Sequence, residues 1–145
     1  MKKVFSVFIL ALFILFLTAC SSEELTNTAT YEDWSLELQN AEVFTDENGN
    51  SRVRVNAVYT NDSHEPLYAL CSFAVRAFQN DIELTDYSDI NGNEAELIRE
   101  VKNGKSINVS YVFDYPEDTQ IEVLIGSPTA DMTTIGKQVY FSEEE

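Results

Sequence analysis

The sequence predicts an all-β protein, an antiparallel sandwich of seven or eight short strands. Apolar and polar residues alternate with period two through most of residues 31–141. Turn-forming Asn, Asp and Gly separate these runs at short intervals. No run shows the period of a long helix or the order of a βαβ unit. The length of this region is close to the ~100 residues of a single sandwich domain.

The first two predicted strands form a hairpin. Apolar residues alternate with polar ones from Trp34 toward Phe44. An Asn-Gly pair in residues 45–50 is typical of hairpin turns. The next strand carries its apolar residues at every second position: Val53, Val55, Ala57 and Tyr59. We expect the two strands to pair antiparallel.

The later elements follow the same pattern. A third strand is predicted from its apolar residues, Cys71, Phe73, Val75 and Ala77. Asn80-Asp81 predicts a tight turn, and a short helical turn is expected near residues 93–97. The clearest strand has one apolar face, made of Ile107, Val109, Tyr111, Phe113 and Tyr115. Residues 120–125 and 135–141 are predicted to complete the sandwich.

The N-terminal segment predicts export. Sixteen of the first 20 residues are apolar, Lys2 and Lys3 precede most of them, and the apolar stretch of about 14 residues is shorter than a membrane span. The ending Leu17-Thr18-Ala19-Cys20 resembles the lipobox of bacterial lipoproteins. That resemblance implies a cleaved lipoprotein signal peptide, residues 1–19, and a lipid anchor on Cys20. A plain secretory signal with an incidental cysteine is the alternative.

Polar, aperiodic sequence follows the cysteine, so we expect residues 20–30 to be the lipidated cysteine and a flexible tether. Residues 31–141 are the predicted sandwich, and residues 142–145 an acidic tail. The whole chain carries 25 acidic and 9 basic side chains, a net charge of −16. Removing the signal peptide leaves 7 basic side chains and a net charge of −18. This charge excludes a nucleic-acid partner, because binding to phosphate backbones needs a basic surface.

Three stretches carry a family resemblance: residues 61–63, the run Ala77-Phe78-Gln79-Asn80 with the alternating aliphatics around it, and residues 104–106. They are similar to immunoglobulin-like lipoprotein domains of unknown function, found chiefly on Gram-positive bacteria. The similarity covers residues 53–125, with Asp81 in place of the glycine expected at that turn. It implies an immunoglobulin-like sandwich facing the extracytoplasmic side of the cell membrane, and it assigns no catalytic residue.

Candidate reactive residues are few. His64 is the only histidine, and its neighbours Asp62 and Ser63 are adjacent in sequence, which rarely produces the geometry of a catalytic triad. We therefore expect no catalytic residues and no enzymatic activity. Cys71 is predicted to lie on the apolar face of a strand, where a free thiol acts as a small hydrophobic group.

Calcium is the one cofactor that the sequence leaves open; otherwise we expect none. Candidate ligands cluster in one acidic stretch: Asp86, Asp89, Asn91 and Glu94. A second cluster, residues 46–50, is similar, and neither matches the spacing of an EF-hand. Solvated turns rich in Asn, Asp and Gly explain both clusters more simply.

Together these features predict a membrane-anchored lipoprotein whose domain binds a protein or another cell-envelope component without covalent chemistry. Tyrosines near strand ends, Tyr68, Tyr87 and Tyr115, are candidates for a contact patch. The alternative is a cation-stabilised sensory or accessory subunit of a membrane complex.

Overall fold

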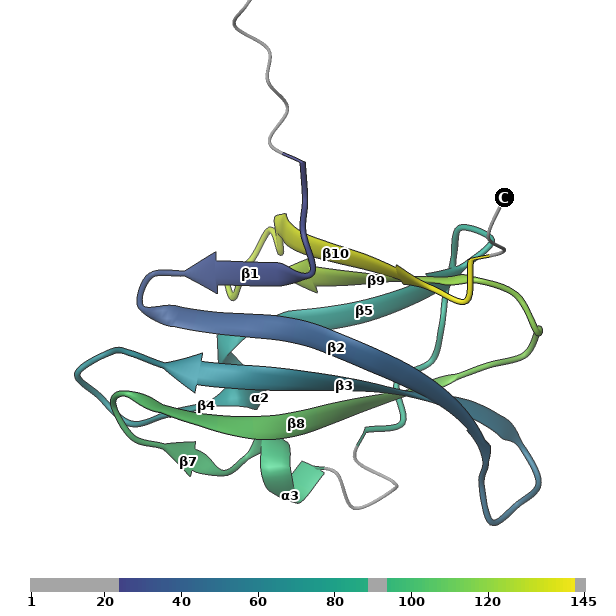
Figure 1. Ribbon diagram of the computed structural model, residues 1–145, viewed down its shortest axis with the longest axis horizontal. Helices are drawn as coiled ribbons and strands as arrows, with labels where there is room; N and C mark the ends of the chain where they lie inside the picture. The colour runs from purple at the N-terminus through teal and green to yellow at the C-terminus, as the bar shows by residue number, and fades with distance from the viewer. Residues whose placement is uncertain (1–23, 89–93, 143–145) are drawn as a thin grey trace, which may run out of the picture.

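Two four-stranded antiparallel sheets make up the core of the computed structural model, which describes residues 24–88 and 94–142 (Figure 1). The first sheet has the order β1-β2-β3-β8. Its strands are β1 (Thr28–Tyr31), β2 (Trp34–Thr45), β3 (Ser51–Asn61) and β8 (Lys105–Asp114). The second sheet has the order β10-β9-β5-β6. Its strands are β10 (Thr134–Tyr140), β9 (Ile121–Gly126), β5 (Ala74–Gln79) and β6 (Ile82–Glu83). The predicted all-β antiparallel sandwich is confirmed.

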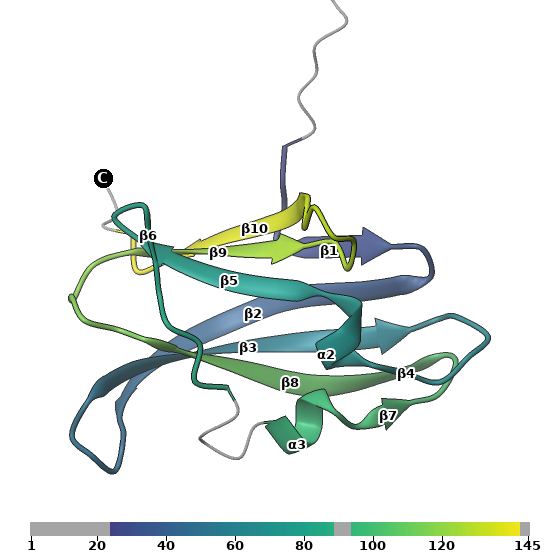
Figure 2. The same ribbon diagram turned by 180° about the vertical axis from the view of Figure 1, so that it is seen from behind.

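Smaller elements lie beside β8, on the side of the molecule away from β1 (Figures 1 and 2). Strand β4 (Leu67–Tyr68) pairs with β7 (Glu100–Val101). Helix α2 (Ala69–Ser72) precedes β5, and helix α3 (Glu94–Leu97) packs against β8. Neither helix of the described residues is long and apolar enough to cross a membrane.

The predicted hairpin is confirmed. Strands β2 and β3 pair antiparallel, with Leu36 opposite Tyr59, and the register shifts between Leu38 and Ala41. Gly49 closes the turn with a φ of 85°, a value that favours glycine. Strand β3 keeps one face buried along most of its length, whereas β2 buries only Leu36 and Leu38, before the register shift.

The core lies between the two sheets. Its fully buried side chains come from alternating positions of both: Leu36, Leu38, Val53, Val55, Tyr59, Val109, Phe113, Ile121, Val123 and Ile125. Burying one such aliphatic side chain contributes about 1.5–3 kcal/mol. The period-two pattern in the sequence thus corresponds to the core of the fold.

The turn at Asn80-Asp81 is also confirmed. Both residues have positive φ, 50° and 63°, as a two-residue hairpin turn between β5 and β6 requires. Asp81 replaces the expected glycine at little cost, because Asn and Asp tolerate this backbone region better than other residues with a side chain.

Two predicted boundaries are wrong. The tether was expected to extend to Thr30, but Thr28–Tyr31 pairs with β2 as strand β1, and Ala29 is fully buried. The third strand was expected to include Cys71, but β5 begins at Ala74 and Cys71 lies in α2. In this short helix the Ser72 hydroxyl donates to the Tyr68 carbonyl, 2.8 Å away, and also lies 2.8 Å from the Tyr59 hydroxyl, contacts that the alternating pattern does not reveal.

Candidate functional site

A pocket of about 480 Å³ opens where α2, β5 and β8 meet the loop between β9 and β10. Its volume falls within the range of small-ligand sites, ~300–1,000 Å³. The described residues that line it come from five segments of the chain: Leu70, Cys71, Phe73, Ala74, Val75, Asp86, Ser88, Leu97, Tyr111, Ser127, Pro128, Thr129, Ala130 and Met132.

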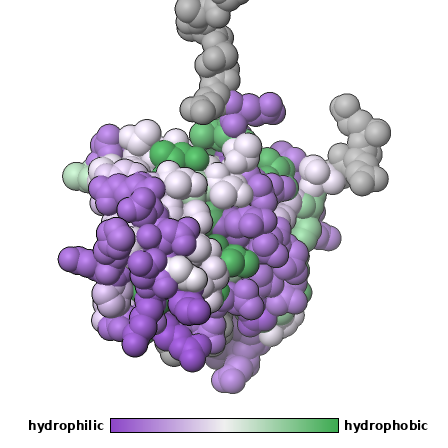
Figure 3. All heavy atoms as spheres, turned by 60° about the vertical axis from the view of Figure 1, so that its left-hand side comes forward, coloured by the Kyte–Doolittle hydropathy of each residue, from purple (hydrophilic) through white to green (hydrophobic). Residues whose placement is uncertain are grey.

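Part of the lining is apolar and faces solvent. Leu70 on α2 is 48% exposed, and Met132 in the β9–β10 loop is 45% exposed. Figure 3 shows a largely hydrophilic surface on which hydrophobic residues form only separate small patches. Of the large exposed hydrophobic side chains among the described residues, Leu70 and Met132 are the two that line this pocket.

Tyr111 is the buried polar residue of the lining whose side chain lacks a partner in the part of the chain that the structure describes, whereas the buried hydroxyls of Ser88 and Ser127 are hydrogen-bonded. It is only 4% exposed, and its hydroxyl has no hydrogen-bond partner among the described residues. Burial, and then the nearby charge of Asp86, raise the pKa of this tyrosine above its ordinary range. An unpaired buried hydroxyl costs about 1–3 kcal/mol. The pocket thus contains a polar group whose hydrogen-bonding capacity is unused.

Tyr59, on the neighbouring strand, is different. Its hydroxyl lies 2.8 Å from the Ser72 hydroxyl, which in turn donates to the Tyr68 carbonyl. Two buried tyrosines of the same sheet therefore differ in one respect: the fold supplies a partner for Tyr59 and, within the described residues, none for Tyr111.

Asp86 is positioned by a strap, residues 85–88, that runs along the edge of β8. The Asp114 amide donates to the Thr85 carbonyl, the Tyr87 amide donates to the Val112 carbonyl, and the Val112 amide donates to the Ser88 hydroxyl. The Asp86 Oδ1 atom accepts from the Ser88 amide at 2.8 Å and its hydroxyl at 2.5 Å. These contacts hold an exposed carboxylate at the pocket.

A second polar group, the Arg52 cluster, consists of Arg52, Asp46, Asp114 and Tyr87. The Arg52 guanidinium pairs with Asp46 at 3.0 Å and with Asp114, and lies 3.8 Å from the centre of the Tyr87 ring. Asp46 also accepts hydrogen bonds from the amides of Asn48 and Asn50, and the Asn50 contact is the largest cause of its lowered pKa. Asp46, the carboxylate that begins this acidic stretch, is therefore paired with an arginine of the same chain.

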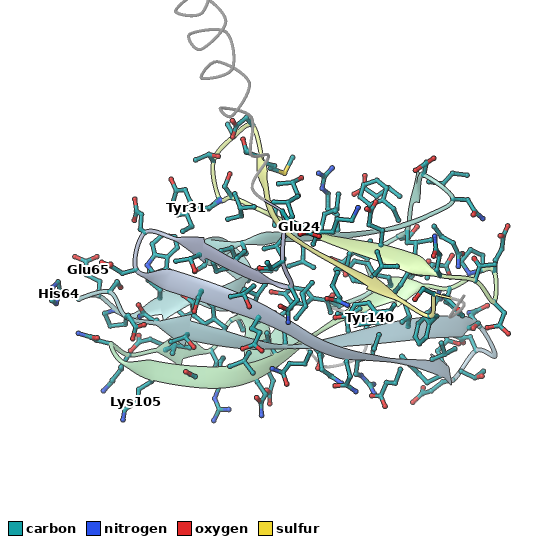
Figure 4. All side chains as sticks on the ribbon, turned by 45° about the horizontal axis from the view of Figure 1, so that its top comes forward. Glu24, Tyr31, His64, Glu65, Lys105 and Tyr140 are labelled. Atoms are coloured by element: carbon teal, nitrogen blue, oxygen red, sulfur yellow. The ribbon has the colours of Figure 1, made fainter. Side chains whose placement is uncertain are left out.

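The other predicted residues are dispersed. His64 is exposed in the β3–β4 loop and points away from the sandwich (Figure 4). The Ser63 hydroxyl lies 2.7 Å from Asn61 Oδ1 and 2.9 Å from the Glu65 carbonyl, which are turn contacts. Cys71 was predicted to be buried; it is exposed on α2, where it lines the pocket, so that prediction is wrong.

The calcium hypothesis stays a prediction. Of its four candidates, Asp86 is placed at the pocket, Asp89 and Asn91 lie outside the described residues, and only the backbone of Glu94 is described, at the start of α3. Within the described residues, no three His, Cys, Asp or Glu side chains come together as ligands. Cys20, the predicted lipidation site, also lies outside the described residues.

Sequence reasoning missed the pocket. The alternating pattern correctly predicts that Tyr111 lies in the core, but it predicts no partner for the Tyr111 hydroxyl and does not distinguish Leu70 or Met132 from other apolar residues. A tyrosine at an inward position in the middle of a strand is the available signal, because a buried hydroxyl needs a partner.

Comparisons with known proteins agree with this fold. A family with the description "Domain of unknown function (DUF5067)" matches residues 18–125. A "putative lipoprotein" from Staphylococcus aureus is similar in structure, with a TM-score of 0.61 at 10% identity, over 79% of this chain and 87% of that one. A "putative lipoprotein" from Bacillus subtilis has a TM-score of 0.61 at 13% identity, and the match covers 84% of this chain and 40% of the Bacillus subtilis protein.

A protein from Enterococcus faecalis is similar as well, with a TM-score of 0.57 at 15% identity, over 84% of this chain and 96% of that one. At these identities the similarity concerns the fold. No curated protein matches the chain.

Proposed function

The chain belongs to the DUF5067 family of domains of unknown function, and we propose that it is a lipid-anchored lipoprotein on the extracytoplasmic side of the membrane. Its sandwich binds a protein or another cell-envelope component through the pocket, by contact rather than catalysis. The observation that carries the binding role is the unpartnered Tyr111 hydroxyl in a pocket bordered by exposed Leu70 and Met132.

The anchor is supported by the sequence Leu17-Thr18-Ala19-Cys20 behind a positively charged and then apolar segment. Two of the similar structures are described as putative lipoproteins. Strand β1 begins eight residues after Cys20, and even a fully extended chain spans at most ~3.6 Å per residue. The sandwich would therefore stay within about 29 Å of the lipid.

The anchor is tested by processing of the precursor. Globomycin, which blocks lipoprotein signal peptidase, should leave the precursor uncut, and Cys20→Ala should prevent lipid labelling. Processing that continues unchanged in the presence of the drug would contradict the anchor and favour a plain secretory signal.

The binding role is supported by two features that occur together at the pocket. Buried polar groups in folded proteins are almost always hydrogen-bonded, and exposed apolar side chains that border a concave site mark contact surfaces. Here the Tyr111 hydroxyl lacks a partner among the described residues, and Leu70 and Met132 are exposed in the same lining. A partner that covers Leu70 and Met132 would bury apolar area and could supply a hydrogen bond to Tyr111.

Crosslinking on intact cells tests the binding role, with two matched variants. Leu70→Glu places a charge at the rim of the pocket, and Ile82→Glu places one on an exposed apolar side chain of β6, which does not line the pocket. We expect the crosslinked product to fall at least about fivefold with Leu70→Glu, as for an interface anchor, and to persist with Ile82→Glu. Equal yields from both variants would contradict the role of the pocket.

The alternative function, a cation-stabilised accessory subunit of a membrane complex, predicts a different product. The crosslinked partner would then be an integral membrane protein, and chelation of divalent cations would lower the melting temperature of the purified chain. A partner captured equally well after chelation would favour simple binding.

A further inference from the structure

The chemistry of the pocket limits what it can bind. Within the described residues, none of the side chains that line it is basic, and one, Asp86, is a carboxylate. The strap of residues 85–88 fixes this carboxylate through Oδ1, which accepts both hydrogen bonds from Ser88. Asp86 forms no ion pair with any cation among residues 24–88 and 94–142.

A neighbouring carboxylate shows the contrast. Asp131, in the β9–β10 loop, accepts hydrogen bonds from the hydroxyls of Thr129 and Thr133, one on each carboxylate oxygen. Those contacts lower its pKa and use both of its oxygens. Asp86 lines the pocket with one oxygen engaged by the strap and the other without a protein donor among the described residues, so it can accept a hydrogen bond from a ligand.

Apolar groups complete the site. Phe73, Val75 and Leu97 line its interior, while Leu70 and Met132 are exposed beside it. The sequence as a whole is strongly acidic, with a net charge of −16. An anionic ligand would meet Asp86 without a compensating cation, whereas a cation would pair with it.

We propose that the pocket binds a small organic ammonium ion with an apolar body. The ammonium group donates to Asp86, the apolar body lies against Phe73 and Val75, and a polar atom of the ligand pairs with the Tyr111 hydroxyl. This assignment rests on the proposed function, because it names the class of ligand for the same pocket.

Three matched probes test the ligand class: 2-phenylethylamine, 2-phenylethanol and 3-phenylpropanoate. They share an apolar body and differ in a cationic, neutral or anionic end. Cys71 reports occupancy, because it lines the pocket and is exposed. The measurement is the rate at which methyl methanethiosulfonate, a small neutral reagent that spares amines, modifies the purified lipidated protein in non-ionic detergent.

The amine should protect Cys71 at a concentration about tenfold lower than either other probe, the discrimination expected of one charge-assisted hydrogen bond. Asp86→Asn should remove this tenfold preference. Asp81→Asn is the matched control: it removes the same charge from the β5–β6 turn, where the backbone has the positive φ that Asn accepts. It should change protection less than about twofold, as expected of a distant, screened charge.

Tyr111→Phe provides a second variant in case Asp86→Asn disturbs the strap. It keeps the ring and removes the hydroxyl to which a second N–H of the probe's ammonium group can donate, so protection by the amine should weaken about fivefold.

Equal protection by the alcohol or the carboxylate would overturn the ammonium assignment and leave the pocket as a binding site. The same assignment is overturned if the amine gives no protection or if Asp81→Asn weakens it as much as Asp86→Asn. The proposed binding function fails separately, when Leu70→Glu leaves crosslinking on cells unchanged.

Discussion

The Arg52 cluster and the Tyr111 pocket share strand β8 and the strap of residues 85–88, yet their buried polar groups have opposite surroundings. Arg52 is 7% exposed and has two carboxylates and an aromatic ring as partners. Tyr111 is 4% exposed and its hydroxyl has none within the described residues. In the Arg52 cluster the buried charge is paired within the chain, whereas in the pocket a buried hydroxyl can still form a hydrogen bond with a ligand.

This difference separates stability from binding. A buried charge whose partners come from the same chain holds the β2–β3 turn and the end of β8 together, and nothing remains for a ligand to satisfy. An unpartnered hydroxyl costs stability in the free protein, and a ligand can recover that cost. Substitutions in the two regions should therefore have opposite consequences.

The largest effect is expected from Arg52→Ala. Removing the guanidinium leaves Asp46 and Asp114 facing each other without a cation, which should lower the free energy of unfolding by about 3 kcal/mol. Arg54→Ala is the matched control on the same strand, because Arg54 also pairs with a carboxylate, Glu42, and stacks on a ring, Phe44, but is more exposed. It should cost under about 1 kcal/mol. Urea denaturation measures both variants. Equal losses in the free energy of unfolding would contradict a larger contribution from the buried Arg52 pairs than from the more exposed Arg54 pair.

The next effect compares the two tyrosines directly. Tyr59→Phe removes a hydroxyl that pairs with Ser72 and should lower the free energy of unfolding by about 1 kcal/mol. Tyr111→Phe removes a hydroxyl without a described partner, so the same measurement should show no loss beyond about 0.5 kcal/mol, or a gain. A loss from Tyr111→Phe as large as that from Tyr59→Phe would mean that Tyr111 is hydrogen-bonded in the free protein.

A smaller effect should appear in acid. Hydrogen bonds, first from the Asn50 amide, and the Arg52 charge hold the pKa of Asp46 below its ordinary value of 3.8. Because the folded pKa is the lower one, the carboxylate stabilises the fold above pH 3.8 and loses that contribution as the pH falls through the folded value. The stability difference between the natural chain and Asp46→Asn should therefore shrink below that pH. Urea titrations at several pH values measure it, and a difference that grows in acid would contradict this assignment.

The fold could be predicted where side chains alternate without interruption. Strands β3 and β8 and the first half of β2 follow their period-two patterns because one face of each lies against the core. The turn at Gly49 sets the pairing of β2 with β3, and the turn at Asn80-Asp81 sets the pairing of β5 with β6. The prediction failed at Cys71, where alternation continued in the sequence but Ser72 formed a tertiary contact with Tyr59 instead. A hydrogen bond between residues 13 positions apart does not change the pattern of apolar and polar residues, so that pattern could not predict it.

The pocket could be predicted even less. Its lining comes from five separate segments, and a sequence does not show which of them converge. Asp86 looked like one member of an acidic stretch, and its position depends on the pairing of the strap with β8. The unpartnered state of Tyr111 is a property of the packed core and has no counterpart in local pattern.

The smallest expected change in stability, and the sharpest test of the open region, concerns Cys71. Because the side chain is exposed on α2, Cys71→Ser should change the free energy of unfolding by less than about 0.5 kcal/mol, as for other surface substitutions. A neutral thiol reagent should modify the native protein at a rate within about tenfold of that in denaturant, whereas a buried thiol reacts far more slowly. Slow labelling of the native protein would contradict an open pocket beside α2.

The Cys71→Ser variant also serves as the control for the anchor, because a thioether at Cys20 would leave that variant with no thiol to label, in the native or the denatured state. Labelling that persists in Cys71→Ser would contradict the lipid attachment while leaving the pocket intact.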